Sequence, residues 1–137
     1  LTNKVHKLED GQVSIHSDSS TIERPNGLYT LKSGTLLLGA EGVGNLGVVD
    51  AKDSTFKPWI EGIEQVDGIA RDEHGHYFAS NWRGRVLYVT EAGESWVLLD
   101  TSDEGINAAD IDIIEHKKLL LVPTFHDNRV VAYKIQY

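Results

Sequence analysis

The chain has 137 residues, a formal net charge of −8 and no cysteine. Its length suits one ordinary domain, the lack of cysteine excludes a disulfide framework and a thiolate metal site, and the acidic balance argues against a nucleic-acid partner because phosphates attract basic side chains. No apolar run approaches the roughly 18 residues of a membrane span. We therefore expect a soluble protein without a membrane partner; its compartment, cytoplasm or periplasm, stays open.

The first segment, residues 3–16, is predicted to form two short strands. Alternating apolar residues flank Asp10-Gly11, and both of these residues tolerate the positive φ of a tight hairpin turn. The polar residues 17–23 then form a predicted loop that leads to Pro25-Asn26-Gly27. Because no stretch combines helical periodicity with capping residues, we expect an all-β protein.

A 15-residue pattern then occurs three times. It reads PNGLYTLKSGTLLLG from Pro25, VDGIARDEHGHYFAS from Val66 and AADIDIIEHKKLLLV from Ala108, at offsets of 41 and 42 residues. Aligned without a gap, the copies share a polar turn and three apolar columns, which are Leu28/Ile69/Ile111, Leu36/Tyr77/Leu119 and Leu37/Phe78/Leu120. A period of about 40 to 45 residues with several strands per unit is typical of a β-propeller blade.

The repeat predicts a β-propeller segment of about three four-stranded blades. We place one blade at residues 26–63, a second at 67–100 and a third, with three strands, at 109–135, all within a single domain of residues 1–137. Residues 3–16 resemble the outer half of a blade whose inner half is absent. A fan of about three blades leaves an apolar blade face at each end, and such faces drive association.

The candidate functional residues gather on one rim of the predicted fan. In a four-stranded meander, the loop before the first strand and the connection between strands two and three lie at the same end, where the first strands converge on a central channel. This rim carries Asn26, Glu41, Asp67, Asn81, Trp82, Arg83 and His126. The opposite rim carries Asp72, Glu73, His74 and His76, which we interpret as ordinary solvated turn residues.

The motifs PNGL, VDGIARDEHGHYFASNWRGRVLYV and NRVVAYKI resemble the gluconolactonase/regucalcin-like family of six-bladed propellers, and specifically the C-terminal half of such a ring. In that family a Glu, two Asn and an Asp hold one divalent metal, and the metal and the Asp hydrolyse a sugar lactone. The resemblance implies that Asn26 and Asp67 are metal ligands and that Asp67 is also the general base. The other two ligands have no counterpart in this chain.

The chemistry of these residues agrees with that implication. Ca²⁺, Mg²⁺ and Zn²⁺ all accept oxygen ligands, and a bound cation polarises a carbonyl and acidifies water so that a carboxylate can accept a proton. A structural role stays open, because Asn and Asp before Gly are also favoured turn residues.

A candidate substrate pocket comprises Glu41, Asn81, Trp82, Arg83 and His126, with Arg83 placed to bind a carboxylate or phosphate group. Three of these residues also have a structural interpretation. Trp82 can cap a blade, Arg83 can be solvated, and His126-Asp127 can be part of a loop turn.

The sequence therefore predicts a metal-dependent hydrolase of a sugar lactone or similar ester, with a lactone or sugar acid as its small-molecule partner. The alternatives are a non-catalytic propeller module and a self-associating half-propeller without activity. Two copies joined head to tail would close a six-bladed ring, so we also expect a homodimer. The joint would hold one strand more than a four-stranded blade needs.

Overall fold

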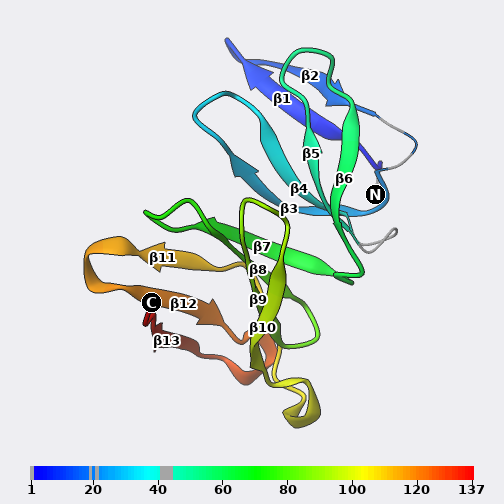
Figure 1. Cartoon of the computed structure of the whole chain (residues 1–137). Helices are drawn as coiled ribbons and strands as arrows, with labels where there is room; N and C mark the ends of the chain where they lie inside the picture. The colour runs from blue at the N-terminus through cyan, green and yellow to red at the C-terminus, as the bar shows by residue number, and fades with distance from the viewer. Residues whose placement is uncertain (1, 19, 21, 41–44) are drawn as a thin grey trace.

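The structure is a computed structural model that describes residues 2–18, 20, 22–40 and 45–137 (Figure 1). These residues form strands and three short 3-10 turns, at Ser102–Glu104, Glu115–Lys117 and Phe125–Asp127, and no α-helix. No helix in the described part of the chain is long and apolar enough to cross a membrane. The strands are β1 (Val5–Glu9), β2 (Gln12–Ser17), β3 (Pro25–Thr30), β4 (Leu36–Ala40), β5 (Asn45–Val49), β6 (Phe56–Glu61), β7 (Val66–Arg71), β8 (Tyr77–Asn81), β9 (Arg85–Val89), β10 (Ser95–Asp100), β11 (Asp112–Ile114), β12 (Leu119–Pro123) and β13 (Val130–Lys134).

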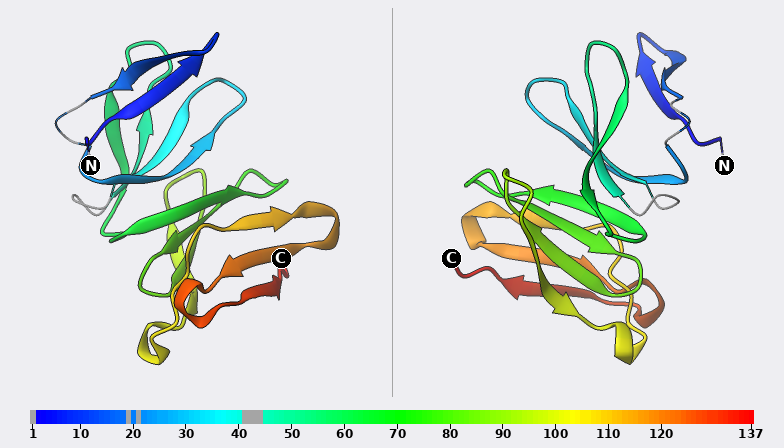
Figure 2. Two further views of the ribbon diagram at one scale, coloured as in Figure 1. Left: turned by 180° about the vertical axis from the view of Figure 1, so that it is seen from behind. Right: turned by 45° about the vertical axis from the view of Figure 1, so that its right-hand side comes forward.

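The strands form four antiparallel sheets in chain order. Blade 1 is β3-β4-β5-β6, blade 2 is β7-β8-β9-β10 and blade 3 is β11-β12-β13, while β1 and β2 form a two-stranded sheet. The first strands β3, β7 and β11 are adjacent, with β7 in contact with both of the others. The blades therefore fan out from a common inner edge (Figures 1 and 2), which confirms the prediction of an all-β half-propeller.

Apolar side chains fill the spaces between successive sheets. One cluster, which includes Leu37, Leu46 and Tyr77, lies between blades 1 and 2. A second cluster, centred on Phe78 and Leu120, lies between blades 2 and 3. The second strands β4 and β8 are buried along nearly their whole length, because they are covered on both faces, so their residues do not alternate between apolar and polar.

The two-stranded sheet β1-β2 lies beside the free face of blade 1 (Figure 2). Val5 and Ile22 pack there with Leu38, Val49 and Phe56, and the Ser17 hydroxyl donates a hydrogen bond to the Ser54 backbone oxygen at 2.6 Å. The hairpin turn at Asp10-Gly11 has positive φ at both residues, as predicted.

The third repeat departs by one residue from the gapless alignment. In blade 2, Tyr77 and Ala79 are the residues of β8 that pack toward the preceding blade. The equivalent residues of β12 are Leu120 and Val122, not Leu119 and Leu121 as the alignment predicts. Leu119, Leu120 and Leu121 are all leucine, so the sequence pattern alone does not specify which of them faces inward.

Candidate functional site

Asn26 and Asp67 occupy equivalent positions at the start of the inner strands β3 and β7. The sequence placed them in loops, but both lie inside a strand, within an irregularity of the first hairpin. The register shifts between Pro25 and Leu28 in blade 1 and between Val66 and Ile69 in blade 2. A β-bulge leaves its residues out of the ladder and redirects their side chains. The repeat therefore sets two oxygen-bearing side chains apart from the ladder at the same rim.

The backbones of the inner strands approach closely at this rim. A Cβ placed on Gly27 would lie 2.5 Å from the Asp67 backbone oxygen, and a Cβ placed on Gly68 would lie 2.4 Å from the Ile111 backbone nitrogen. Neither glycine has the positive φ that would require its backbone freedom. The glycine of the Asn-Gly and Asp-Gly pairs is thus needed for contact between blades, not for a turn.

Asp110 is a further carboxylate at this rim that the sequence analysis did not select. A Cβ on Gly68 would lie 2.7 Å from the Asp110 Oδ1 atom, so the Asp110 side chain lies over the residue that follows Asp67. Its column in the repeat holds glycine in the two other copies, Gly27 and Gly68. The presence of aspartate where the two other repeats have glycine is the sequence feature that could have identified Asp110 as a candidate.

Ser80 connects blade 2 to blade 3 at Gly68, the residue after Asp67. Its buried hydroxyl accepts a hydrogen bond from the Gly68 backbone nitrogen at 2.8 Å and donates one to the Ala109 backbone oxygen at 2.7 Å. Ala109 is the equivalent of Asp67 in the third repeat, so that position has no oxygen-bearing side chain in blade 3. The hydroxyl links the two positions across the blade boundary.

Trp82 faces blade 3, where it joins an aromatic cluster with Phe125 and His126. Its ring centroid is 5.0 Å from that of Phe125 and 5.9 Å from that of His126, both in edge-to-face geometry. Phe125 is 60% exposed and has a positive φ of 43°, a conformation that costs a non-glycine residue roughly 1–2 kcal/mol. The structure thus brings Trp82 and His126 together, with Phe125 as a member that the sequence analysis missed.

Asn81 and Arg83 face blade 1 instead. The Asn81 side chain donates to the Glu64 backbone oxygen and accepts from the Arg83 backbone nitrogen, and the Arg83 guanidinium donates to Gln65 Oε1 at 3.2 Å. Both residues line a cavity of about 410 Å³, which also includes Gly62, Ile63, Glu64, Arg85, Leu87, Val97 and Ser102. The predicted pocket residues therefore divide into two groups, and Glu41 lies outside the described residues.

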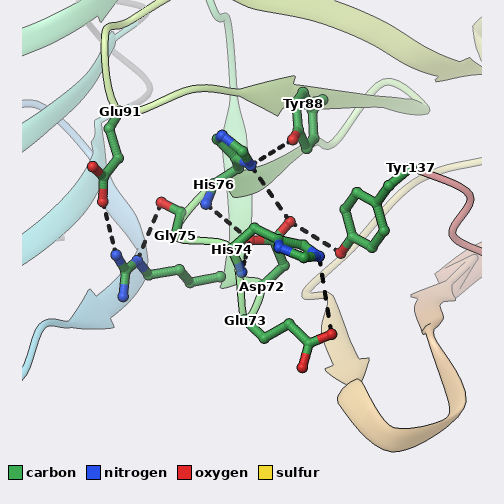
Figure 3. A network of polar contacts seen from close by, with 9 residues as sticks. Asp72, Glu73, His74, Gly75, His76, Tyr88, Glu91 and Tyr137 are labelled. Carbon is green, nitrogen blue, oxygen red and sulfur yellow. Dashed lines mark hydrogen bonds and ion pairs between the residues drawn. The ribbon is translucent and has the colours of Figure 1, made fainter.

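The opposite rim holds a polar network (Figure 3). Glu73 and His74 are exposed there, as expected for turn residues, but Asp72 is buried and His76 is partly buried, which corrects our interpretation of those two. The carboxylate of Asp72 is buried and accepts hydrogen bonds from the backbone nitrogens of His74 and His76, at 3.0 and 2.9 Å, and from the Tyr137 hydroxyl at 3.0 Å. His76 is only partly exposed, and its Nδ1 atom lies 2.6 Å from the Tyr88 hydroxyl.

The charge of Asp72 affects both tyrosines. Burial and the hydrogen bond to Asp72 raise the pKa of Tyr137 above its ordinary value, and burial, with a smaller contribution from the Asp72 charge, raises the pKa of Tyr88. The Asp72 carboxylate accepts hydrogen bonds both from the hairpin backbone and from Tyr137. The network therefore holds the C-terminal segment against the hairpin of blade 2.

The oxygen donors at the inner rim fit a hard cation in type but not in number. Asn26 and Asp67 offer amide and carboxylate oxygens, which Ca²⁺ and Mg²⁺ prefer, whereas Ca²⁺ takes about six to eight ligands. In the described part of the chain, no group of three or more His, Asp or Glu side chains is arranged to hold a metal ion. The described residues therefore show no complete metal site.

Fold and rim together define the protein as a β-propeller segment with a candidate site at the channel mouth. A scan against known protein families and a search of curated proteins both found no match. Solved structures do match. A gluconolactonase from Xanthomonas campestris has a TM-score of 0.70 and 18% identity, with 88% of this chain and 41% of that chain covered.

Two further solved structures are similar. Regucalcin, a calcium-binding protein from Agrobacterium tumefaciens, has a TM-score of 0.66 and 21% identity, over 87% of this chain and 43% of that one. A chain of a nidogen/laminin complex has a TM-score of 0.71 and 15% identity, over 96% and 58%. The resemblance to gluconolactonase/regucalcin-like propellers is thus confirmed at the level of fold, and the chain spans about half the length of the structures it matches.

Proposed function

We propose that this chain forms part of a metal-dependent hydrolase that opens a sugar lactone or a similar cyclic ester. The observation that supports the proposal is the repeated bulge that presents Asn26 and Asp67 from adjacent inner strands at one rim. Equivalent positions of neighbouring blades face the same axis, so both residues would address one ligand at the channel mouth. A bound divalent cation there would polarise the lactone carbonyl.

Asp67 is the proposed general base. Its carboxylate would accept a proton from a water molecule whose oxygen bonds to the lactone carbonyl carbon. The ring C–O bond then breaks, and the proton passes to the ring oxygen that leaves as a hydroxyl group. Asn26 carries no titratable group, so its amide would orient and bind without a proton transfer.

The test is to replace Asp67 by Asn and measure acid release from gluconolactone at constant pH, with added Ca²⁺, Mg²⁺ or Zn²⁺ and with a chelator. Loss of a general base lowers the rate by about 10²–10⁴-fold, and we expect a loss in that range. Calorimetric titration with each metal should also show weaker binding. Asp103→Asn is the matched control, because Asp103 is an exposed carboxylate on the short turn after β10. Unchanged hydrolysis by Asp67→Asn would refute the assignment.

A non-catalytic binding module is the second candidate, and the aromatic cluster favours it. Trp82, Phe125 and His126 form a partly exposed surface at the same rim, and aromatic side chains are enriched where proteins bind partners. The same fold also occurs in a nidogen/laminin complex. This alternative predicts that neither gluconolactone turnover nor metal binding depends on Asp67.

A further inference from the structure

The two ends of the chain carry incomplete blades that are complementary. Blades 1 and 2 have four strands each, while in the described residues blade 3 has three strands and β1-β2 has two. In chain order β2 leads into β3 as β6 leads into β7 and β10 into β11. By this order β2 has the place of a fourth strand and β1 that of a third.

A shared irregularity confirms the place of β1 and β2 in the repeat. In both complete blades the fourth strand has one extra residue opposite the third strand, Trp59 in β6 and Leu98 in β10. The pairing of β1 with β2 has the same irregularity, with His16 as the extra residue of β2. Bulges at fixed places are built-in features of a fold rather than defects. The bulge therefore aligns Val5 of β1 with Leu46 of β5 and Val86 of β9.

The strand β13 has the place of a third strand, and no fourth strand pairs with it among the described residues. The Thr124 backbone nitrogen donates to the Arg129 backbone oxygen. In blade 2, Asn81 pairs with Arg85 at the corresponding place. Val130, which follows Arg129, is therefore the equivalent of Val86, which follows Arg85. Leu46 and Val86 are both 0% exposed, whereas Val130 is 63% exposed. The difference arises because no further blade covers that face of blade 3 among the described residues.

An apolar groove marks the place of the missing strand. It has a volume of about 290 Å³ and lies between β10 and β13, lined by Phe78, Leu98, Leu99, Leu120, Tyr133, Lys134, Ile135 and Gln136. At the other end of the chain, Val13 and Ile15 of β2 are exposed, at 70% and 51%. In the fourth strands β6 and β10, the residues equivalent to Val13 and Ile15 lie on the face that is turned toward the preceding blade. In the described part of the chain, the groove beside β13 is therefore apolar and holds no strand, and the exposed face of β2 is apolar and packs against no groove.

We propose that a second copy of this chain supplies the missing strand, with β13 of each copy paired to β2 of the other. The bulge sets the register: Val130 lies opposite Ser17, Ala132 opposite Ser14 and Tyr133 opposite Val13. Val13 and Ile15 then cover the groove. Each copy contributes two complete blades, and the two joints β11-β12-β13-β2 complete a ring of six. This proposal does not depend on the chemistry of the inner rim.

The register also accounts for the additional strand in the ring. β13 of one copy and β1 of the other are both third strands, so they compete for the same edge of β2. β1 is the weaker competitor, because Val5 is its only buried residue, and an isolated two-stranded hairpin is marginally stable in water. We infer that β1 is displaced when the ring closes, as an exchange of equivalent strands between copies.

Cysteine cross-linking tests the register, because these 137 residues include no cysteine. Directly opposite residues of antiparallel strands have Cβ atoms about 4.5–5.5 Å apart, close enough for a disulfide after a small adjustment. The double variant Ala132→Cys/Ser14→Cys should form a covalent dimer on mild oxidation, because these strands lie at opposite ends of one chain (Figures 1 and 2). A closed ring gives dimer without a ladder of higher species.

Two matched variants make the test specific. Lys7→Cys/Ser14→Cys joins residues that pair within one chain, so its disulfide should lock β1 onto β2 and leave a monomer. Ala132→Cys/Gln12→Cys places the second cysteine two residues out of register and should cross-link much less. Light scattering of the unmodified protein should give the mass of a dimer. A stable monomer, or equal cross-linking of the in-register and out-of-register pairs, would overturn the proposal.

Discussion

The Ser80 hydroxyl donates a hydrogen bond to the backbone oxygen of Ala109, 29 residues further along the chain, at 2.7 Å. Ser80 lies at the end of β8 in blade 2, and Ala109 precedes the first strand of blade 3. The same hydroxyl accepts from the Gly68 backbone nitrogen. One buried side chain thus fixes the backbone beside Asp67 relative to the next blade.

Replacing Ser80 by Ala should destabilise the protein. The substitution leaves a buried donor and a buried acceptor without their partner, which costs about 1–3 kcal/mol in the free energy of unfolding. Urea unfolding followed by far-UV circular dichroism measures the change. Ser95→Ala, at an exposed site on β10, should stay within about 0.5 kcal/mol of the natural protein. Equal stability of the two variants would show that the hydroxyl does not connect the blades.

Replacing Gly68 by Ala should separate blades 2 and 3, because the new Cβ would overlap the Ile111 backbone nitrogen and the Asp110 side chain. Overpacking of this kind costs about 1–3 kcal/mol, and here the obstacle is backbone. Gly11→Ala is the comparison: its Cβ would meet no atom within 4 Å, and only its left-handed conformation opposes the change. A larger fall in the urea midpoint for Gly11→Ala would contradict the role of Gly68.

Replacing Tyr137 by Phe should loosen the C-terminal segment. The substitution removes the hydroxyl that donates to Asp72 but retains the ring that packs edge-to-face on His74 at 4.4 Å. We expect a loss of about 1 kcal/mol, below the roughly 1.5–3 kcal/mol of a hydrogen bond to a charged group, because Tyr137 is 58% exposed. Hydrogen exchange of the amides in residues 135–137 should accelerate, while exchange in blade 1 stays unchanged.

The raised pKa of Tyr137 gives a dependence of stability on pH with a defined sign. The folded protein holds the phenol proton more tightly than the unfolded chain, whose tyrosines ionise near pH ~10, so this stabilisation is fully present below pH ~10 and is lost as pH rises above it. Thermal unfolding from pH 8 upward should show a steeper decline for the natural protein than for Tyr137→Phe. Parallel curves would mean that Tyr137 ionises equally in both states.

Replacing Phe125 by Ala should separate ligand binding from stability. Phe125 is largely exposed and contacts Trp82 and His126 only through its ring edges and faces, so the free energy of unfolding should change by less than about 1 kcal/mol. If the aromatic cluster binds a partner or substrate, the variant should bind it more weakly. Trp82 fluorescence provides the measurement, since its ring is 5.0 Å from the substituted one.

The sequence by itself determined the fold class and the number of repeats. Apolar columns at offsets of 41 and 42 residues require strands that bury both faces, and a glycine after Asn26 and after Asp67 predicts equivalent backbone at equivalent places. The sequence also placed both residues at the same rim, because repeats put equivalent positions around one axis. Those conclusions depend on local sequence patterns, which are the same whatever the details of side-chain packing.

Only the tertiary structure decided which faces and partners these residues have. The Leu119–Leu121 run is equally apolar at each position, so its register was set by contact with blade 2 and not by the pattern. Asp72 lies in an ordinary turn sequence, and its hydrogen bond from the Tyr137 hydroxyl joins residues 65 apart in the chain. The bulge that aligns β2 with β6 and β10 is a property of strand pairing. Long-range contacts supply the energy that selects among locally equivalent alternatives, so they are visible only in the folded chain.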